Sequence, residues 1–232
     1  MTLRTRIALA SPHSRHDELE RELREAPDLE VLRVRTQNEL ARERIKAFGP
    51  RYLFFAHWSW RIPAELHENY ECIIFHMTDV PFGRGGSPLQ NLILRRMEVT
   101  MLTALRCVAA MDAGPVYMKQ PLSTLGTAEE VLGRAARLML PMILSIVRNN
   151  PAPVEQAGQV VDFQRRTPAQ SNAVEVRSLR ELFDFIRMLD ADGYPPAFLE
   201  AGAFRFEFTR ASLKSDCLIA DVRITSRKEK GE

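Results

Sequence analysis

The residues best suited to chemistry lie in a polar, glycine-dense segment that directly follows an apolar run. Residues 75–90 read FHMTDVPFGRGGSPLQ, and the apolar residues before them are typical of a buried strand. His76 is expected to end that strand, and the active sites of open parallel sheets lie at such strand ends. Its imidazole could move a proton near neutral pH. Taken alone, a structural histidine is the simpler interpretation, so a catalytic role needs a partner.

The glycines that follow His76 are compatible with an anion site. Residues 83–86 are Gly-Arg-Gly-Gly and come directly before a predicted helix at 87–95. Unobstructed backbone N–H groups ahead of a helix suit a phosphate or another anion. The same glycines could simply permit a tight turn. Both interpretations stay open at this point.

Two further groups of residues allow a functional and a structural interpretation. Asp112 stands before Ala113-Gly114-Pro115 in a sharp connection, where an aspartate commonly serves only the turn. Trp58 and Trp60 follow a strand-like run and could stack on a flat ligand or pack in the core.

Other chemistry is not favoured by the sequence. The first apolar run leads into Ser11-Pro12-His13 without a glycine, which disfavours nicotinamide and flavin cofactors. No histidine and cysteine spacing suits a metal. We expect Cys72, Cys107 and Cys217 to be reduced core residues, because they are odd in number and far apart in apolar stretches.

Alternating strands and helices are expected to position these residues. Helical patterns separate the apolar runs at 6–10, 52–56 and 71–75 and the alternating stretch at 29–34, an order that predicts an α/β fold with a mainly parallel sheet. Residues 100–108 and 115–120 add strands, and Thr127 and Glu130 form a capping box that opens a long helix. The predicted organisation is a catalytic domain at 1–150, a polar linker at 151–173 and a small α+β subdomain at 174–232.

Composition restricts the class of protein. The 232 residues are 45% hydrophobic and 27% charged, as in folded globular proteins. The 32 basic and 30 acidic residues are interleaved, which argues against a mainly electrostatic nucleic-acid binder. No apolar run approaches the roughly 20 residues that cross a bilayer. We therefore expect a cytoplasmic protein without a membrane partner.

Together these motifs resemble the folate-dependent formyltransferase family. Residues 76–81, HMTDVP, with the glycine loop at 83–86, are similar to the family's histidine and arginine-glycine motif, and residues 111–116, MDAGPV, to its aspartate-x-glycine motif. The resemblance implies a Rossmann-like sheet, 10-formyltetrahydrofolate as co-substrate, no metal, and catalysis by His76 and Asp112. Residues 60–63 resemble the loop that lines the family's pterin pocket, which implies folate contacts by Trp60, Arg61 and Ile62.

One departure from the family pattern concerns the oxyanion. The family usually has an asparagine two residues before the histidine, where this chain has Ile74. Loss of an oxyanion donor typically costs about 100-fold to 1000-fold in rate. The complete motif strings resemble most a subgroup of amino-sugar formyltransferases of pseudaminic-acid-type pathways and related peptide-synthetase formylation domains, in which the asparagine is also missing.

This resemblance implies an acceptor. We expect the amine of a nucleotide-linked amino sugar, with Thr78, Arg84, Gly85 and Gly86 as substrate-binding residues, and no nucleic acid as a partner. The alternatives are a methionyl-tRNA formyltransferase or a formyl-folate hydrolase on the same scaffold, and a degenerate protein that binds without catalysis. A homodimer is compatible with Phe204, Phe206 and Phe208, which alternate on one predicted strand face.

Overall fold

The computed structural model describes residues 4–227, which form two compact units. The first unit consists of residues 4–85, Thr100–Leu122 and Gly133–Asp162. The second consists of Gly86–Val99, Ser123–Leu132 and residues 163–227. The predicted division at residues 150 and 173 stays a prediction.

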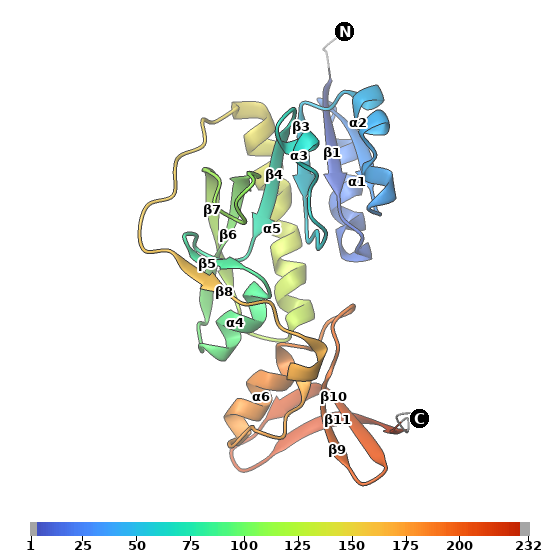
Figure 1. The fold of residues 1–232 in the computed structure, drawn as a ribbon, viewed down its shortest axis with the longest axis vertical. Coiled ribbons are helices and arrows are strands. Elements are labelled where there is room, and N and C mark those ends of the chain that lie inside the picture. Colours follow the sequence, from blue (N-terminus) through green and yellow to red (C-terminus); the bar gives the residue numbers. More distant parts are fainter. Residues whose placement is uncertain (1–3, 228–232) are drawn as a thin grey trace. The chain divides into compact units, whose positions relative to one another are not determined.

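A six-stranded sheet in the order β2-β1-β3-β4-β6-β7 is the basis of the first unit (Figure 1). The pairs β1–β2, β1–β3 and β3–β4 are parallel, whereas β6 runs antiparallel to β4. The prediction of a mainly parallel α/β sheet is therefore confirmed. The strands are β1 (Thr5–Ala10), β2 (Leu29–Val34), β3 (Tyr52–Phe55), β4 (Glu71–His76), β6 (Val99–Arg106) and β7 (Val116–Ser123).

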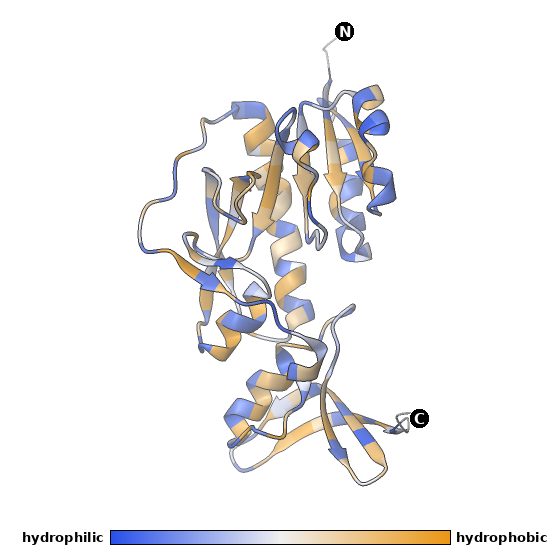
Figure 2. Cartoon of the chain, viewed as in Figure 1, coloured by the Kyte–Doolittle hydropathy of each residue, from blue (hydrophilic) through white to orange (hydrophobic). Residues whose placement is uncertain are grey.

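The apolar runs form strands because helices and loops bury them. All four residues of β3 are buried, as are the last four of β1, and Figure 2 shows these strands as mainly hydrophobic. Parallel strands covered on both faces have such continuous apolar runs. The parallel strands β1, β2, β3 and β4 all end at one edge, so His76, the last residue of β4, lies there.

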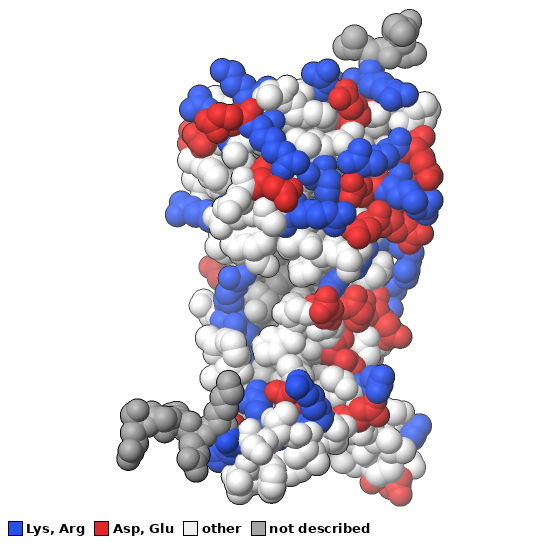
Figure 3. Space-filling view, turned by 90° about the vertical axis from the view of Figure 1, so that its right-hand side faces the viewer, with Lys and Arg blue, Asp and Glu red and all other residues white. Residues whose placement is uncertain are grey.

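Helix α1 (Asp17–Glu25) shows how the periodic pattern becomes amphipathic structure. Leu19 and Leu23 are buried, while Arg21 pairs with Glu18 and Glu25 on the exposed side. On the face drawn in Figure 3, basic and acidic side chains are correspondingly interleaved. Residues 38–48, whose pattern is that of one helix, form two pieces, η2 (Asn38–Leu40) and α2 (Arg42–Phe48), because Ala41 between them is extended.

The remaining helices agree with the predicted pattern. Thr127 and Glu130 exchange the predicted capping-box bonds, since the Glu130 N–H donates to Thr127 Oγ1 and the Thr127 N–H to Glu130 Oε2. Among the described residues no helix is both long and apolar enough to span a membrane. The helices are α3 (Ala64–His67), α4 (Pro88–Leu94), α5 (Ala128–Asn149) and α6 (Leu179–Arg187), and the 3-10 turns are η1 (Ser14–His16) and η3 (Pro168–Ser171).

The second unit ends in an antiparallel sheet of order β11-β10-β9 that accompanies α6, which confirms the predicted α+β unit. Its strands are β9 (Ala197–Ala201), β10 (Phe204–Leu213) and β11 (Leu218–Ser226). Phe204, Phe206 and Phe208 pair with Ser226, Ile224 and Val222, so the three rings share one face as predicted. The homodimer stays a prediction. A separate two-stranded ladder joins β5 (Phe82–Gly85) to β8 (Val161–Phe163), and neither of its strands was expected from the sequence.

Candidate active site

His76 is held at the end of β4 by a bond from its ring to the following loop. Its Nε2 lies 2.7 Å from the carbonyl oxygen of Gly83, and Thr78 Oγ1 donates to the same oxygen at 3.1 Å. A carbonyl oxygen can only accept, so Nε2 carries a proton and Nδ1 is the nitrogen left for exchange. Thr78 and His76 thus share one anchoring oxygen, which fixes the plane of the imidazole.

Asp112 meets His76 from the loop after β6. Asp112 Oδ2 accepts the Gly85 N–H at 2.8 Å and lies 3.6 Å from His76 Nδ1. The two side chains are only 9% and 11% exposed, so water screens their interaction weakly. The separation exceeds a hydrogen bond and is typical of catalytic pairs that tighten when substrate binds. His76 and Asp112 therefore lie close together, and their catalytic roles stay a prediction.

Backbone geometry explains why this loop contains Asp112-Ala113-Gly114. Asp112 has a φ of 50°, a left-handed conformation that aspartate tolerates better than most residues. A Cβ on Gly114 would lie 1.9 Å from the carbonyl oxygen of Arg106, so only glycine fits there. Close backbone approach therefore lets the loop turn back toward His76.

Gln156 is a site residue that the sequence did not reveal. Its Oε1 accepts from Arg84 Nε and Nη2 at 3.0 and 2.8 Å. Its Nε2 donates to the carbonyl oxygens of Asp112 and Gly114 at 2.7 and 2.8 Å. A single glutamine in a polar linker gives no periodic or motif signal. Two of its partners are main-chain carbonyl oxygens, which only the folded loop brings together.

The predicted substrate-binding glycines already use their N–H groups within the protein. Gly85 donates to Asp112, and Gly86 donates to the carbonyl oxygen of Phe163 at 3.1 Å. An anion at this loop would thus rely on side chains, of which Arg84 is the charged one. Binding of substrate by Thr78, Arg84, Gly85 and Gly86 stays a prediction.

The three folate candidates lie between β3 and α3 in the first unit. Trp60 is 40% exposed, and its ring meets Trp58 edge-on at a centroid distance of 4.8 Å. Arg61 is exposed. Ile62 and Trp58 pack against the same apolar cluster as Ile74, the residue two positions before His76. The segment therefore presents an aromatic ring and a cation beside the cluster that supports the catalytic strand.

A buried donor near this segment lacks a partner. Trp58 Nε1 is buried and has no hydrogen-bond partner among the described residues. A buried unpaired N–H is costly, so an acceptor atom of a bound ligand would stabilise it. A pterin ring offers such nitrogen and oxygen acceptors together with a flat face for Trp60. These residues fit a folate.

Ile74 confirms that the oxyanion position has no amide. Its side chain packs on the apolar cluster with Trp58 and Cys107, and a hydrocarbon cannot donate a hydrogen bond. Cys107 is no substitute as a nucleophile. Burial, with a contribution from Asp112, raises the pKa of its thiol to about 11, so it stays protonated at neutral pH.

Three other histidines form a separate group at the ends of β1 and β3. The His13 and His57 ring centroids are 5.4 Å apart, and His16 lies 6.1 Å from His57. Burial, with a smaller effect of Arg33, lowers the pKa of His16 to about 3, and burial also holds the pKa of His57 well below its usual value. The rings of His16 and His57 are therefore neutral at physiological pH. No group of three possible metal ligands occurs in the described part of the chain.

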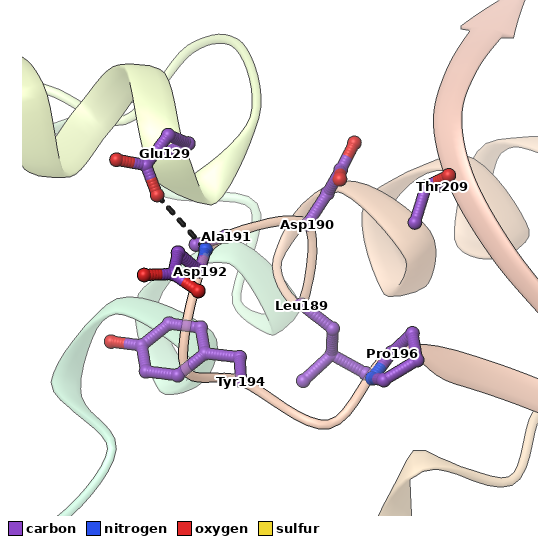
Figure 4. A pocket seen from close by; sticks show the side chains of 8 residues that line it. All are labelled: Glu129, Leu189, Asp190, Ala191, Asp192, Tyr194, Pro196 and Thr209. Atoms are coloured by element: carbon purple, nitrogen blue, oxygen red, sulfur yellow. Dashed lines mark hydrogen bonds between the residues drawn. The ribbon is translucent and has the colours of Figure 1, made fainter.

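A pocket of about 340 Å³ in the second unit contains carboxylates with structural partners (Figure 4). Glu129 Oε2 accepts the Asp192 N–H at 3.0 Å, and Asp190 Oδ2 accepts the Arg210 N–H at 2.7 Å. These acids hold the turn after α6 in place. The lining residues are Glu129, Leu189, Asp190, Ala191, Asp192, Tyr194, Pro196 and Thr209.

Known proteins resemble this chain in sequence and in fold. Residues 168–225 match the family described as methionyl-tRNA formyltransferase, C-terminal domain. The solved methionyl-tRNA formyltransferase of Clostridium thermocellum is 40% identical, with a TM-score of 0.94, over 96% of this chain and 100% of that one. A methionyl-tRNA formyltransferase of Bacillus thuringiensis is 25% identical over 74% of this chain. The chain spans only 57% of that curated relative's length.

The expected amino-sugar acceptor is wrong, and so is the exclusion of a nucleic-acid partner. A sugar N-formyltransferase from a Shewanella species aligns over 97% of this chain and 99% of its own, but at 15% identity and a TM-score of 0.63 it shares the fold alone. The more similar relatives are methionyl-tRNA formyltransferases. Charge balance misled the prediction because net charge does not report on local contacts. The 40% identity to the Clostridium thermocellum protein over nearly the whole chain shows that this chain belongs to the formyltransferase family.

Proposed function

We propose that the protein transfers the formyl group of 10-formyltetrahydrofolate to the amine of methionyl-tRNA. The observation that carries the chemistry is the approach of His76 Nδ1 to Asp112 Oδ2, 3.6 Å apart and mostly buried at the end of β4. The acceptor is supported by the names of the relatives, foremost the one that is 40% identical.

The reaction requires proton movement that this pair can perform. The uncharged amine attacks the formyl carbon, a C–N bond forms, and the carbonyl oxygen becomes an oxyanion. Asp112 accepts the proton that the amine nitrogen loses, and the bond from carbon to N10 breaks as N10 receives that proton. Positioned acid and base groups usually contribute about 100-fold to 10,000-fold in rate.

His76 stabilises the oxyanion in this scheme, because Ile74 cannot. In the protonated ring, Nε2–H stays on the Gly83 carbonyl and Nδ1–H is available to the oxyanion. The Asp112 carboxylate, 3.6 Å from Nδ1, attracts the positive charge of the ring in the transition state. A cationic donor forms a stronger hydrogen bond than a neutral amide, which compensates for part of the missing asparagine.

The folate is placed on the segment that precedes α3. Trp60 would stack on the pterin, Ile62 would line its apolar edge, and Arg61 would meet an anionic group of the carrier. Trp58 Nε1–H would donate to an acceptor atom of the ring.

The test combines the purified chain and 10-formyltetrahydrofolate with methionyl-tRNA, uncharged tRNA or free methionine. Formylmethionyl-tRNA formation with matching release of tetrahydrofolate supports the proposal. Release of formate without an acceptor would establish a hydrolase instead. No release under any condition, with folate binding intact, would overturn the catalytic assignment.

A further inference from the structure

We infer that Gln156 is a positioning residue, which holds the Asp112 carboxylate in its working orientation and couples it to Arg84. This inference deepens the proposed function and rests on it. Gln156 lies between α5 and β8 in the first unit and is partly buried. It touches no reacting atom in the proposed scheme.

The orientation of the Gln156 amide is determined by its partners. A guanidinium can only donate, so the atom facing Arg84 is the oxygen Oε1. The Asp112 and Gly114 carbonyl oxygens can only accept, so the atom facing them is Nε2. All four bonds are between 2.7 and 3.0 Å long. The side chain therefore uses both ends of its amide at once.

These bonds act on the turn that directs the Asp112 side chain. The two carbonyls bound by Gln156 Nε2 flank Ala113, and Asp112 itself has a left-handed backbone conformation. Residues in such sparsely populated conformations persist when their surroundings hold them. Gln156 supplies such a restraint, because its Nε2 donates to a carbonyl oxygen on each side of Ala113. The direction of the carboxylate toward His76 follows from the turn.

The contacts form a closed circuit. The Arg84 side chain binds Gln156, Gln156 binds the Asp112 main chain, and the Asp112 carboxylate binds the N–H of Gly85, the next residue after Arg84. A displacement of Arg84 by an anionic ligand is thereby transmitted to the carboxylate. The loop at residues 83–86 and the loop at residues 112–114 therefore move together as long as Gln156 is present.

Gln156→Glu separates this role from simple anchoring of Arg84. The carboxylate keeps, or strengthens, the bonds to the guanidinium. It places an oxygen without a proton against two carbonyl oxygens, so the restraint on the Asp112 turn is lost. If Gln156 served only Arg84, the glutamate would be harmless. If it positions Asp112, the glutamate acts like alanine.

The experiment measures formyl transfer by the full chain with Gln156→Glu, Gln156→Ala and the control Gln159→Ala. Gln159 is exposed in the same linker. We expect kcat to fall about 10-fold to 100-fold in both Gln156 variants, because misplacement of a catalytic group by about 1 Å costs up to about 100-fold. KM for the folate should stay near the wild-type value, and so should the melting temperature of Gln156→Glu. Gln159→Ala should behave like the wild type.

A second readout is independent of activity. Hydrogen exchange of the Gly85 amide, which donates to Asp112 Oδ2, should be faster in both Gln156 variants and unchanged in Gln159→Ala. Wild-type kcat and wild-type Gly85 exchange in Gln156→Glu would overturn the inference. If the wild-type chain transfers no formyl group, the proposed function fails, whereas the exchange measurement still decides whether Gln156 restrains Asp112.

Discussion

Replacement of Asp112 by asparagine tests the central pair with little disturbance of the fold. The asparagine side chain has the same shape and can still accept the Gly85 N–H bond with its carbonyl oxygen. What it loses is the negative charge and the ability to accept a proton.

The size of the effect follows from the separation of the two groups. Opposite unit charges 3.6 Å apart attract by about 4 to 5 kcal/mol at an effective dielectric constant of about 20. That attraction is present when His76 is cationic in the transition state and is absent in the variant. A loss of this size corresponds to about a 1000-fold lower rate. The usual range for acid and base catalysis includes this value.

The assay is single-turnover transfer from 10-formyltetrahydrofolate to methionyl-tRNA at saturating protein, which excludes effects of product release. Asp79→Asn is the matched control, because Asp79 lies in the same segment as His76 but pairs with Lys119. Folding is verified by the melting temperature of both variants. A single-turnover rate for Asp112→Asn close to that of Asp79→Asn would refute the reasoning.

Three further predictions concern stability and folate binding. Gly114→Ala should lower the free energy of unfolding by about 2 kcal/mol, because the added methyl group overpacks against the Arg106 carbonyl, and it should also lower kcat. Gly133→Ala in α5, where the nearest atom is 3.9 Å away, should instead raise the free energy of unfolding by up to about 1 kcal/mol. Urea denaturation measures both changes. The pKa of His16 is about 3 in the folded protein against 6.5 for a free side chain, so between these values only the unfolded chain binds the proton. The free energy of unfolding should therefore be greatest above pH 6.5 and fall toward pH 3. At pH 5 it should be lower by about 2 kcal/mol. His16→Gln should flatten this dependence and His67→Gln should not; an equal slope in wild type and His16→Gln would contradict the burial argument. Trp60→Ala should weaken folate binding about 10-fold without changing the melting temperature, because an aromatic stacking contact contributes about 1 to 1.5 kcal/mol. Titration of the intrinsic fluorescence with folate measures the affinity. Equal affinity of wild type and variant would remove Trp60 from the folate site.

The sequence predicted most of the sheet because its strands are buried on both faces. Continuous apolar runs such as residues 52–56 have one structural interpretation in an alternating chain, and β3 (Tyr52–Phe55) lies in that range. Strand β5 was missed because its residues FGRG have no hydrophobic pattern, and its partner β8 lies in the polar linker. Strand β9 was missed because Pro195 and Pro196 directly before it indicate a turn.

The approach of His76 to Asp112 was predictable for a different reason. His76 ends β4 and Asp112 follows β6, and both belong to motifs whose combination is specific, so their approach could be inferred although they are far apart in the chain. Gln156 could not be inferred, because its role depends on carbonyl groups of a folded turn. The acceptor was mispredicted because the motifs around His76 describe the formyl-transfer centre and not the surface that selects the amine.

Because His76 Nε2 donates to the Gly83 carbonyl, the ring cannot relay a proton through both of its nitrogens. A histidine that conducts protons takes one up at the first nitrogen and releases another from the second, and this ring has only Nδ1 free for exchange. Every proton that enters must leave by the same side, so the charge state of His76 is restored in each cycle by the reactants and Asp112 themselves. In the proposed reaction, the imidazole therefore relays no proton from its Gly83 side to the reacting carbon.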